Sequence, residues 1–249
     1  MRTVLIVGGA NGIGLSIALQ MAQRQDYAKV YIVDRAVPEN KYVANEKIET
    51  FVFDLTESDY SFFDSFADVD TLMITAGFGK LALFADLDEE YIINSMNVNA
   101  TAVMRIIHKF YDRIASERDF LCGVMVSIAG FMSSPFFSVY GASKAALKVF
   151  IESVNVELEK AGVSNRILNV SPGSIKGTSF NNGVTDLEQT ASLAGEIIDH
   201  LHAKDDLFIP QYEQVYKTVL ERYHDDFRAE GRHSYEYKVQ SGRISRNGR

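Results

Sequence analysis

The sequence predicts an α/β fold: a Rossmann-type, doubly wound parallel sheet in three α/β/α layers, built as a single domain. Short apolar runs rich in β-branched residues alternate with longer segments of helical periodicity, a pattern typical of parallel strands joined by crossover helices. The first apolar run, residues 4–7, passes directly into a glycine-rich turn. With 249 residues, 47% of them hydrophobic, the undivided chain can bury one sizeable core.

The predicted elements follow one another in the order that such a sheet needs. Predicted strands cover residues 4–7, 29–33, 49–53, 71–75, 124–126, 167–170 and 207–210. Predicted helices cover residues 13–24, 89–115 in two stretches, 140–160, 186–201 and 213–223. The region around Tyr235 and Tyr237 alternates apolar and polar residues and predicts no particular element.

The glycine-rich turn after the first strand is a candidate nucleotide site. It contains Gly8, Asn11, Gly12, Ile13 and Gly14. Glycines let the backbone approach a pyrophosphate, and the amino end of the next helix offers it free N–H groups and a positive dipole end. The spacing is Gly-x-x-x-Gly-x-Gly rather than Gly-x-Gly-x-x-Gly, so a plain strand-to-helix turn is the alternative.

Asp34 closes the second predicted strand, twenty residues after Gly14. An acidic side chain at this place accepts hydrogen bonds from a ribose 2′-hydroxyl and repels a 2′-phosphate, which favours NAD as the cofactor. Arg35 carries the alternative, because its guanidinium could bind the 2′-phosphate of NADP.

Ser127, Tyr140 and Lys144 are the candidate catalytic residues. Ser127 comes directly after the carboxyl end of a predicted buried strand. Tyr140 begins a predicted helix, which places Lys144 on the same face one turn later. A free tyrosine has a pKa of about 10 and exchanges protons poorly near neutrality. We expect the Lys144 ammonium to lower the pKa of the Tyr140 phenol, so that this residue can act as an acid/base on a carbonyl or alcohol.

Apolar side chains gather in the loops after the strand ends. They are Phe78, Phe131, Met132, Phe136, Phe137 and Phe180. They either form a pocket for an apolar substrate or anchor the loops into the core.

Composition and charge exclude several classes of function. A formal net charge of −8 and the lack of a dense basic patch argue against nucleic acid as a partner. No apolar run approaches the roughly eighteen residues of a membrane span.

The histidines and the cysteine predict neither a metal site nor a disulfide. The five histidines have no metal-site spacing, so no metal is predicted. Cys122 is the one cysteine, which excludes an internal disulfide and fits a cytoplasmic location.

With the glycine turn, Asp34, Ser127 and Tyr140-x-x-x-Lys144 in this order, the chain resembles the short-chain dehydrogenase/reductase family over residues 3–178. The resemblance implies that Tyr140 is the general acid/base and that Ser127 polarises the substrate carbonyl. It implies that Lys144 also binds the nicotinamide ribose, and that Asn99 completes the catalytic set. Further cofactor contacts implied by the resemblance are Asp54, Leu55, Ala76, Gly77, Pro172, Gly173, Ile175 and Thr178.

The chain departs from the family pattern at a few places. Val7 stands where the family usually has threonine, and Thr75 replaces the first residue of the usual Asn-Ala-Gly. Residues 203–249 do not match the common family ending. We therefore expect one NAD(P)-binding domain over residues 1–249, in which residues 203–249 form a divergent C-terminal segment.

The leading functional hypothesis is an NAD(P)(H)-dependent oxidoreductase that transfers hydride between the nicotinamide and a secondary alcohol or ketone. A non-catalytic dinucleotide-binding sensor or scaffold is one alternative, but it has no need of the serine, tyrosine and lysine. A sugar-nucleotide epimerase or dehydratase is the second alternative. Such an enzyme usually has a longer substrate domain and a different glycine spacing.

Two predicted helices carry more apolar residues than one sheet-facing stripe requires, namely residues 97–115 and 140–160. Large exposed apolar patches are uncommon on monomers, so we expect these helices to pack in a homodimer or homotetramer. The alternative is that the segment beyond Ala203 folds back and covers them.

Overall fold

A parallel sheet of seven strands forms the centre of the computed structural model, which describes residues 1–178, 180 and 183–244. The strands are β1 (Arg2–Val7), β2 (Tyr27–Asp34), β3 (Ile48–Val52), β4 (Thr71–Ile74), β5 (Leu121–Met125), β6 (Ile167–Val170) and β7 (Leu207–Phe208). Their order across the sheet is β3-β2-β1-β4-β5-β6-β7. The chain reverses its direction of winding at β1, so the predicted doubly wound sheet is confirmed.

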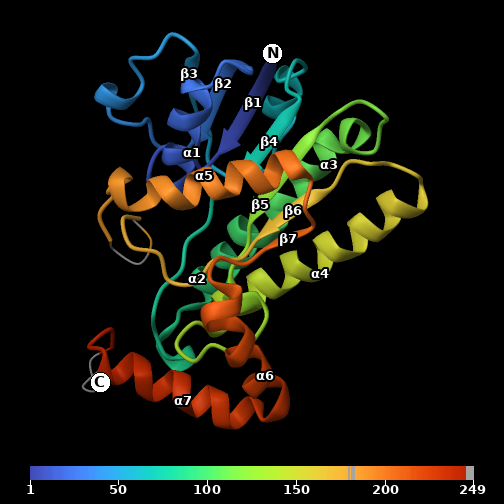
Figure 1. Cartoon of the computed structure of the whole chain (residues 1–249). Coiled ribbons are helices and arrows are strands. Elements are labelled where there is room, and N and C mark those ends of the chain that lie inside the picture. The colour runs from blue at the N-terminus through green and yellow to red at the C-terminus, as the bar shows by residue number, and fades with distance from the viewer. Residues whose placement is uncertain (179, 181–182, 245–249) are drawn as a thin grey trace.

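Helices cover both faces of the sheet (Figure 1). Helices α1 (Gly12–Gln23) and α5 (Leu187–Ala203) lie on one face, and α3 (Ala102–Ile114) and α4 (Ser138–Lys160) lie on the other. The short helix α2 (Glu89–Met96) packs against α4. Alternation along β1 divides its side chains between two cores: Val4 and Ile6 pack with α1 and α5, whereas Leu5 and Val7 pack with α3 and α4. The predicted three-layer arrangement is therefore present.

The connections around β3 contain no α-helix, unlike the other crossovers of the sheet. Residues 35–47 and 53–70, all of which the structure describes, contain the 3₁₀ turns Asn40–Tyr42 and Ser61–Ser65 instead of α-helices. Aromatic rings pack against one another over this end of the sheet: Tyr31, Phe51, Phe53, Tyr60, Phe62, Phe63 and Phe66. Large rings bury enough apolar area to replace the covering of a helix.

The C-terminal segment adds two helices, α6 (Lys217–Asp225) and α7 (Phe227–Gln240), after a π-turn at Tyr212–Tyr216. Figure 1 shows both helices at the end of the molecule opposite the start of β1. Asp226 begins α7 by accepting hydrogen bonds from the amides of Arg228 and Ala229, at 2.9 and 3.0 Å. The sequence does not predict α7, because it has no apolar stripe and its buried residues include Glu230 and Lys238.

The expected second apolar face is present on one of the two helices only. On α4, Val149 and Val156 are 59% and 56% exposed, and α7 lies beyond the amino end of α4 rather than along this face. On α3 the prediction is wrong, because the sheet and the neighbouring helices cover its apolar positions within one chain. The homo-oligomer remains a prediction, which now depends on α4.

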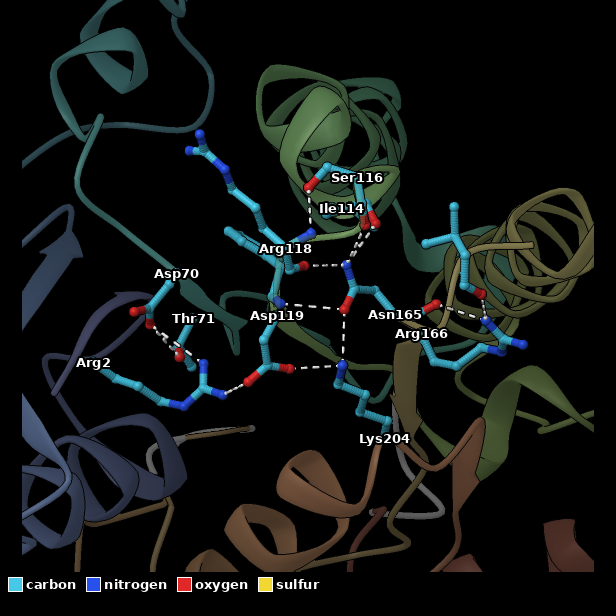
Figure 2. A network of polar contacts seen from close by, with 12 residues as sticks. Arg2, Asp70, Thr71, Ile114, Ser116, Arg118, Asp119, Asn165, Arg166 and Lys204 are labelled. Carbon is cyan, nitrogen blue, oxygen red and sulfur yellow. Dashed lines mark hydrogen bonds and ion pairs between the residues drawn. The ribbon is translucent and has the colours of Figure 1, made fainter. Parts of the chain in front are cut away.

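A polar network joins the elements at the amino edge of the sheet, far from the carboxyl ends of the strands (Figure 2). Asn165 is 1% exposed, and its amide group reaches the carbonyls of Ile114, Ser116 and Arg118 at 2.8–3.1 Å. Its Oδ1 accepts from the Phe120 amide at 3.2 Å and from Lys204 Nζ at 2.9 Å. One side chain therefore ties together the end of α3, the start of β5 and the end of α5.

Ion pairs extend this network to β1. Asp119 pairs with Lys204 at 2.7 Å and with Arg2, which also lies 3.5 Å from Asp70. The hydrogen bond from Lys204 is the largest cause of the lowered pKa of Asp119.

Replacing Asn165 should strongly destabilise the fold. In Asn165→Ala, the Phe120 amide and the carbonyls lose their partner in a buried place, so we expect the free energy of unfolding to fall by about 3 kcal/mol. Urea denaturation of the variant and the wild type measures this loss. The matched control is Asn40→Ala at an exposed position, which should change stability by less than about 0.5 kcal/mol. Equal effects of the two substitutions would contradict the role of Asn165.

Candidate active site

The carboxyl ends of β1, β4, β5 and β6 bring the candidate site together. Val7 lies in register with Ile74, Ile74 with Val124, and Met125 with Val170. The loops that follow these strands therefore start at the same edge of the sheet. They carry the glycine turn, the Ala76–Gly77 pair, Ser127 and the Pro172–Gly173 pair. This edge, at the point where the strand order reverses, is where open α/β sheets bind their ligands.

Close backbone contacts explain the glycines of the first turn. Gly8 has a φ of +92°, and a Cβ atom there would overlap the backbone nitrogen of Ala76. A Cβ atom on Gly14 would overlap the carbonyl oxygen of Gly8 and the hydroxyl of Thr75. That hydroxyl donates to the Gly8 carbonyl at 2.8 Å, so Thr75 fixes the turn even though it departs from the family pattern.

The geometry of this turn fits a dinucleotide. Residues Gly12, Ile13 and Gly14 open α1, with Asn11 at the cap, so the amino end of the helix faces the crevice. Asp34 lies at the end of β2 beside the turn, and its Oδ2 accepts from the Ala10 amide at 3.0 Å. A carboxylate is therefore fixed where the ribose of a bound dinucleotide is expected.

The residues predicted to contact the far end of the dinucleotide lie next to Asp34. Arg35 is exposed. Hydrogen bonds from Thr56 lower the pKa of Asp54, and the positive charge of Arg35 acts in the same direction. The Leu55 carbonyl accepts from the Tyr60 hydroxyl at 2.7 Å, which fixes the backbone of this loop.

Tyr140 and Lys144 lie one turn apart at the amino end of α4, as predicted. Both are buried, with 9% and 2% of their surfaces exposed. Lys144 Nζ lies 5.7 Å from the centre of the Tyr140 ring and donates to the carbonyl of Met125 at 2.9 Å. The last residue of β5 therefore holds the ammonium under the site.

Burial sets the protonation of both groups. Burial raises the pKa of Tyr140 to about 12, although a hydrogen bond with Ser127 opposes this shift. Burial also lowers the pKa of Lys144 to about 8. The expected downward shift of the tyrosine pKa is therefore wrong, because burial of the phenol is the largest cause acting on it and raises the pKa. Near neutrality Tyr140 is a neutral phenol with a proton to donate.

Asn99 fixes the backbone that lies beside Lys144. Its Oδ1 accepts from the Phe78 amide at 2.9 Å, and its Nδ2 donates to the Phe78 carbonyl at 2.8 Å. A Cβ atom on Gly77 would lie 3.2 Å from Asn99 Oδ1 and 3.3 Å from Lys144 Nζ. Asn99 itself lies in the π-turn Asn97–Thr101 between α2 and α3, a feature frequent at functional sites.

Ser143 links Asn99 to Tyr140, and the sequence reasoning missed it. Its hydroxyl donates to the Tyr140 carbonyl at 2.7 Å and accepts from Asn99 Nδ2 at 3.3 Å. The sequence could have indicated Ser143, because it is a small polar residue three positions after Tyr140, on the helix face that also carries the tyrosine.

The loops after β5 and β6 close the site. Ser127 is 8% exposed, and its Oγ accepts from the Ala129 amide at 3.1 Å. The Pro172 carbonyl accepts from the Ile128 amide at 3.0 Å, which couples the two loops. The Thr178 side chain lies 3.4 Å from the place of a Cβ on Gly12, and its hydroxyl donates to the Ile175 carbonyl.

A side chain of the C-terminal segment also reaches this place. A Cβ atom on Gly173 would overlap the hydroxyl of Tyr216, so the tyrosine lies directly against that glycine. The sequence does not indicate that Tyr216 reaches the site, because Tyr216 and Gly173 are far apart in the chain.

The aromatic loop residues divide between pocket and anchor. The rings of Phe137 and Phe180 lie 5.3 and 5.2 Å from the ring of Tyr140. In contrast, Phe136 is 6% exposed and packs on Tyr235 at 4.6 Å. The remaining rings contact other loop or helix residues: Phe78 contacts Tyr91, and Phe131 lies under Lys148.

Two further properties concern the described part of the chain. Within residues 1–178, 180 and 183–244, no group of three or more His, Cys, Asp or Glu side chains is arranged to hold a metal ion. No helix in these ranges is both long and apolar enough to cross a bilayer.

Comparisons with known proteins agree with this geometry. The family model described as short chain dehydrogenase matches residues 2–189. The chain is 28% identical over 231 residues to retinol dehydrogenase 8 of Bos taurus, covering 88% of this chain and 73% of the relative. Among solved structures, a short-chain dehydrogenase from Streptomyces avermitilis superposes with a TM-score of 0.74 at 20% identity, covering 98% of this chain and 100% of that one. One from Sphingobium yanoikuyae in complex with NADPH gives 0.71 at 20% identity, with 91% and 96% covered.

Removing the buried charge of Lys144 should stabilise the protein. The unfolded lysine keeps its ordinary pKa of 10.5, whereas burial lowers the folded pKa to about 8, so at pH 7 folding carries the full penalty of burying the ammonium. Lys144→Met removes this penalty and one hydrogen bond, and we expect a net gain on the order of 2 kcal/mol at pH 7.

The gain should depend on pH with a defined sign. Between pH 8 and 10.5 the unfolded wild type binds more protons than the folded one, so its stability rises and the advantage of the variant shrinks. Urea denaturation of both proteins at pH 7 and pH 10 measures the difference, in which other titrating groups cancel. A variant that is less stable than the wild type at pH 7 would refute the penalty.

Proposed function

Because the chain belongs to the short-chain dehydrogenase/reductase family and is an NAD(P)-dependent oxidoreductase, we propose that it interconverts a secondary alcohol and a ketone with Tyr140 as general acid/base. The observation that carries the proposal is the position of Tyr140, Lys144 and Ser127 together at the carboxyl edge of the sheet, beside the glycine turn. The bound nicotinamide supplies or accepts the hydride.

The residues of the chain account for the movement of the proton. In ketone reduction the neutral Tyr140 phenol donates its proton to the substrate oxygen, because burial raises its pKa to about 12. Ser127 shares a hydrogen bond with Tyr140 and would donate to the same substrate oxygen. Lys144 stabilises the phenolate that remains, since its ammonium is buried beside the ring. In alcohol oxidation the same groups move the proton in the opposite direction.

An apolar substrate fits the surroundings of Tyr140 best. The rings of Phe137 and Phe180 both lie beside the Tyr140 ring and are 6.0 Å apart. Rings in these positions offer apolar area to a substrate and keep water from the reacting oxygen. A relative named for retinol, itself an apolar alcohol, supports this choice.

Asp34 supports NAD as the preferred cofactor. Its carboxylate is fixed by the Ala10 amide, and it would repel the 2′-phosphate of NADP. Arg35 is exposed one residue later and offers the opposite charge, and the solved structure from Sphingobium yanoikuyae holds NADPH. Both cofactors therefore belong in the test.

Tyr140→Phe should abolish most turnover while the variant still binds the cofactor. The substitution removes only the hydroxyl that moves the proton, so we expect kcat to fall by about 10²-fold or more. The assay follows NADH and NADPH absorbance with a panel of apolar alcohols and ketones. The matched control is Tyr212→Phe, which removes a hydroxyl from a tyrosine that is 40% exposed and outside the site.

Two outcomes would contradict the assignment. A Tyr140→Phe variant with near-normal turnover would reject Tyr140 as the acid/base. A wild-type protein that binds the cofactor and turns over no substrate of the panel would favour the dinucleotide-binding sensor instead.

Asp34 should set the cofactor preference. We expect the wild type to bind NAD more tightly than NADP, and Asp34→Asn to bind NADP more tightly than the wild type does, because the charge clash is removed. Titration calorimetry with both cofactors measures the dissociation constants. Arg35→Ala is the companion variant: if NADP binds the wild type as well as NAD does and Arg35→Ala loses it, Arg35 determines the preference.

A further inference from the structure

Helix α7 is fixed to the active-site loop by a buried lysine. Lys238 is 7% exposed, and its Nζ donates to Ser134 Oγ and to the carbonyl of Pro135, both at 2.8 Å. It also lies 5.5 Å from the centre of the Phe137 ring. No carboxylate pairs with it among the residues that the structure describes. A buried ammonium without a carboxylate is costly, so other contacts must hold it in place.

One further contact holds α7 on the same loop, residues 133–137, and a hydrogen bond ties that loop to the loop after β4. Tyr235, one helical turn before Lys238, packs its ring on Phe136 at 4.6 Å. Phe136 has a φ of +68° and is 6% exposed, a backbone conformation that is uncommon and strained for a bulky residue. The Phe136 carbonyl accepts from the Ala82 amide at 3.0 Å, which ties the strained residue to the loop after β4.

The loop continues directly into the first turn of α4. The Phe137 amide donates to the Ser134 carbonyl at 2.9 Å, and the Phe137 carbonyl accepts from the Gly141 amide at 2.7 Å. The Phe137 ring lies 5.3 Å from the ring of Tyr140. Lys238 is therefore connected to Tyr140 through Ser134 and Phe137.

Helix α6 supports α7 at a second place along the helix. Arg222 donates to Glu230 at 2.7 Å across the two helices, and Glu230 is 6% exposed. Glu230 lies two turns before Lys238 on α7, so this ion pair and the Lys238 contacts fix the helix at separate places.

We propose that Lys238 is a positioning residue: by holding residues 133–137, it sets where the first turn of α4 places the phenol of Tyr140. The inference rests on the proposed role of Tyr140 and gives the divergent C-terminal segment a part in it. A displacement of about 1 Å at a reacting group can cost on the order of 10²-fold in rate. Loss of the Lys238 contacts should therefore lower kcat, while cofactor binding at the distant glycine turn stays unchanged.

Lys238→Met tests this role, because methionine keeps an unbranched apolar stem and removes the ammonium. We expect kcat to fall by about tenfold or more, with an unchanged cofactor dissociation constant, when rates are normalised to the fraction of protein that binds cofactor. The matched control is Lys217→Met on α6, which removes an exposed lysine paired with Glu213 and should leave kcat as it is.

Ser134→Ala removes the other partner of the same hydrogen bond. If Lys238 acts through this contact, the effects of Lys238→Met and Ser134→Ala on kcat should be strongly non-additive in the double variant. A normal kcat in Lys238→Met would overturn the proposal. A loss of kcat that disappears after normalisation to the cofactor-binding fraction would also overturn it, since such a loss comes from unfolding alone.

Hydrogen exchange separates this proposal from the proposed function. Amides of residues 131–141 should exchange faster in Lys238→Met than in the wild type, whereas those of β1 and α1 should not. This readout requires no substrate, so it remains valid if the wild type turns over nothing in the panel. Unchanged exchange in residues 131–141 would show that Lys238 does not hold the loop.

Discussion

The buried ammonium of Lys144 is the constraint on which the site depends. A charge that is 2% exposed needs a polar partner and a place that fits it, and three parts of the chain supply these. The Met125 carbonyl at the end of β5 accepts a hydrogen bond from the ammonium, the Tyr140 ring lies beside it, and Gly77 leaves it room after β4. Asn99 then fixes the backbone next to Gly77. Burying this charge lowers the stability of the fold, a loss that is common at active sites.

Local spacing in the sequence predicts the parts of the site that one element carries. The turn between β1 and α1, Asp34 at the end of β2, and Tyr140 with Lys144 on one helix face all follow from short-range periodicity. The sheet order follows from alternating elements as well. Sequence could not give the direction of the Tyr140 pKa, because that direction depends on how deeply the completed fold buries both groups.

The features that the sequence did not predict depend on distant contacts. Ser143 gains its role from Asn99, 44 residues earlier, and Lys238 gains its role from Ser134, 104 residues earlier. The aromatic cluster around Phe53 and Phe62 covers the β3 end of the sheet where the chain has no α-helix, since several rings from adjoining segments bury the area together. Helix α7 has no apolar stripe, and polar contacts with α6 and with the loop that precedes Tyr140 hold it in place.

Hydride transfer between an alcohol and the nicotinamide is the chemistry that we propose for this site. Transfer of deuterium tests it most directly: an apolar alcohol deuterated at its carbinol carbon is oxidised with unlabelled cofactor, and the reduced cofactor is analysed by mass spectrometry. We expect each turnover to place the deuterium on the nicotinamide ring. Product that forms while the deuterium appears in solvent, or stays on the substrate, would contradict it.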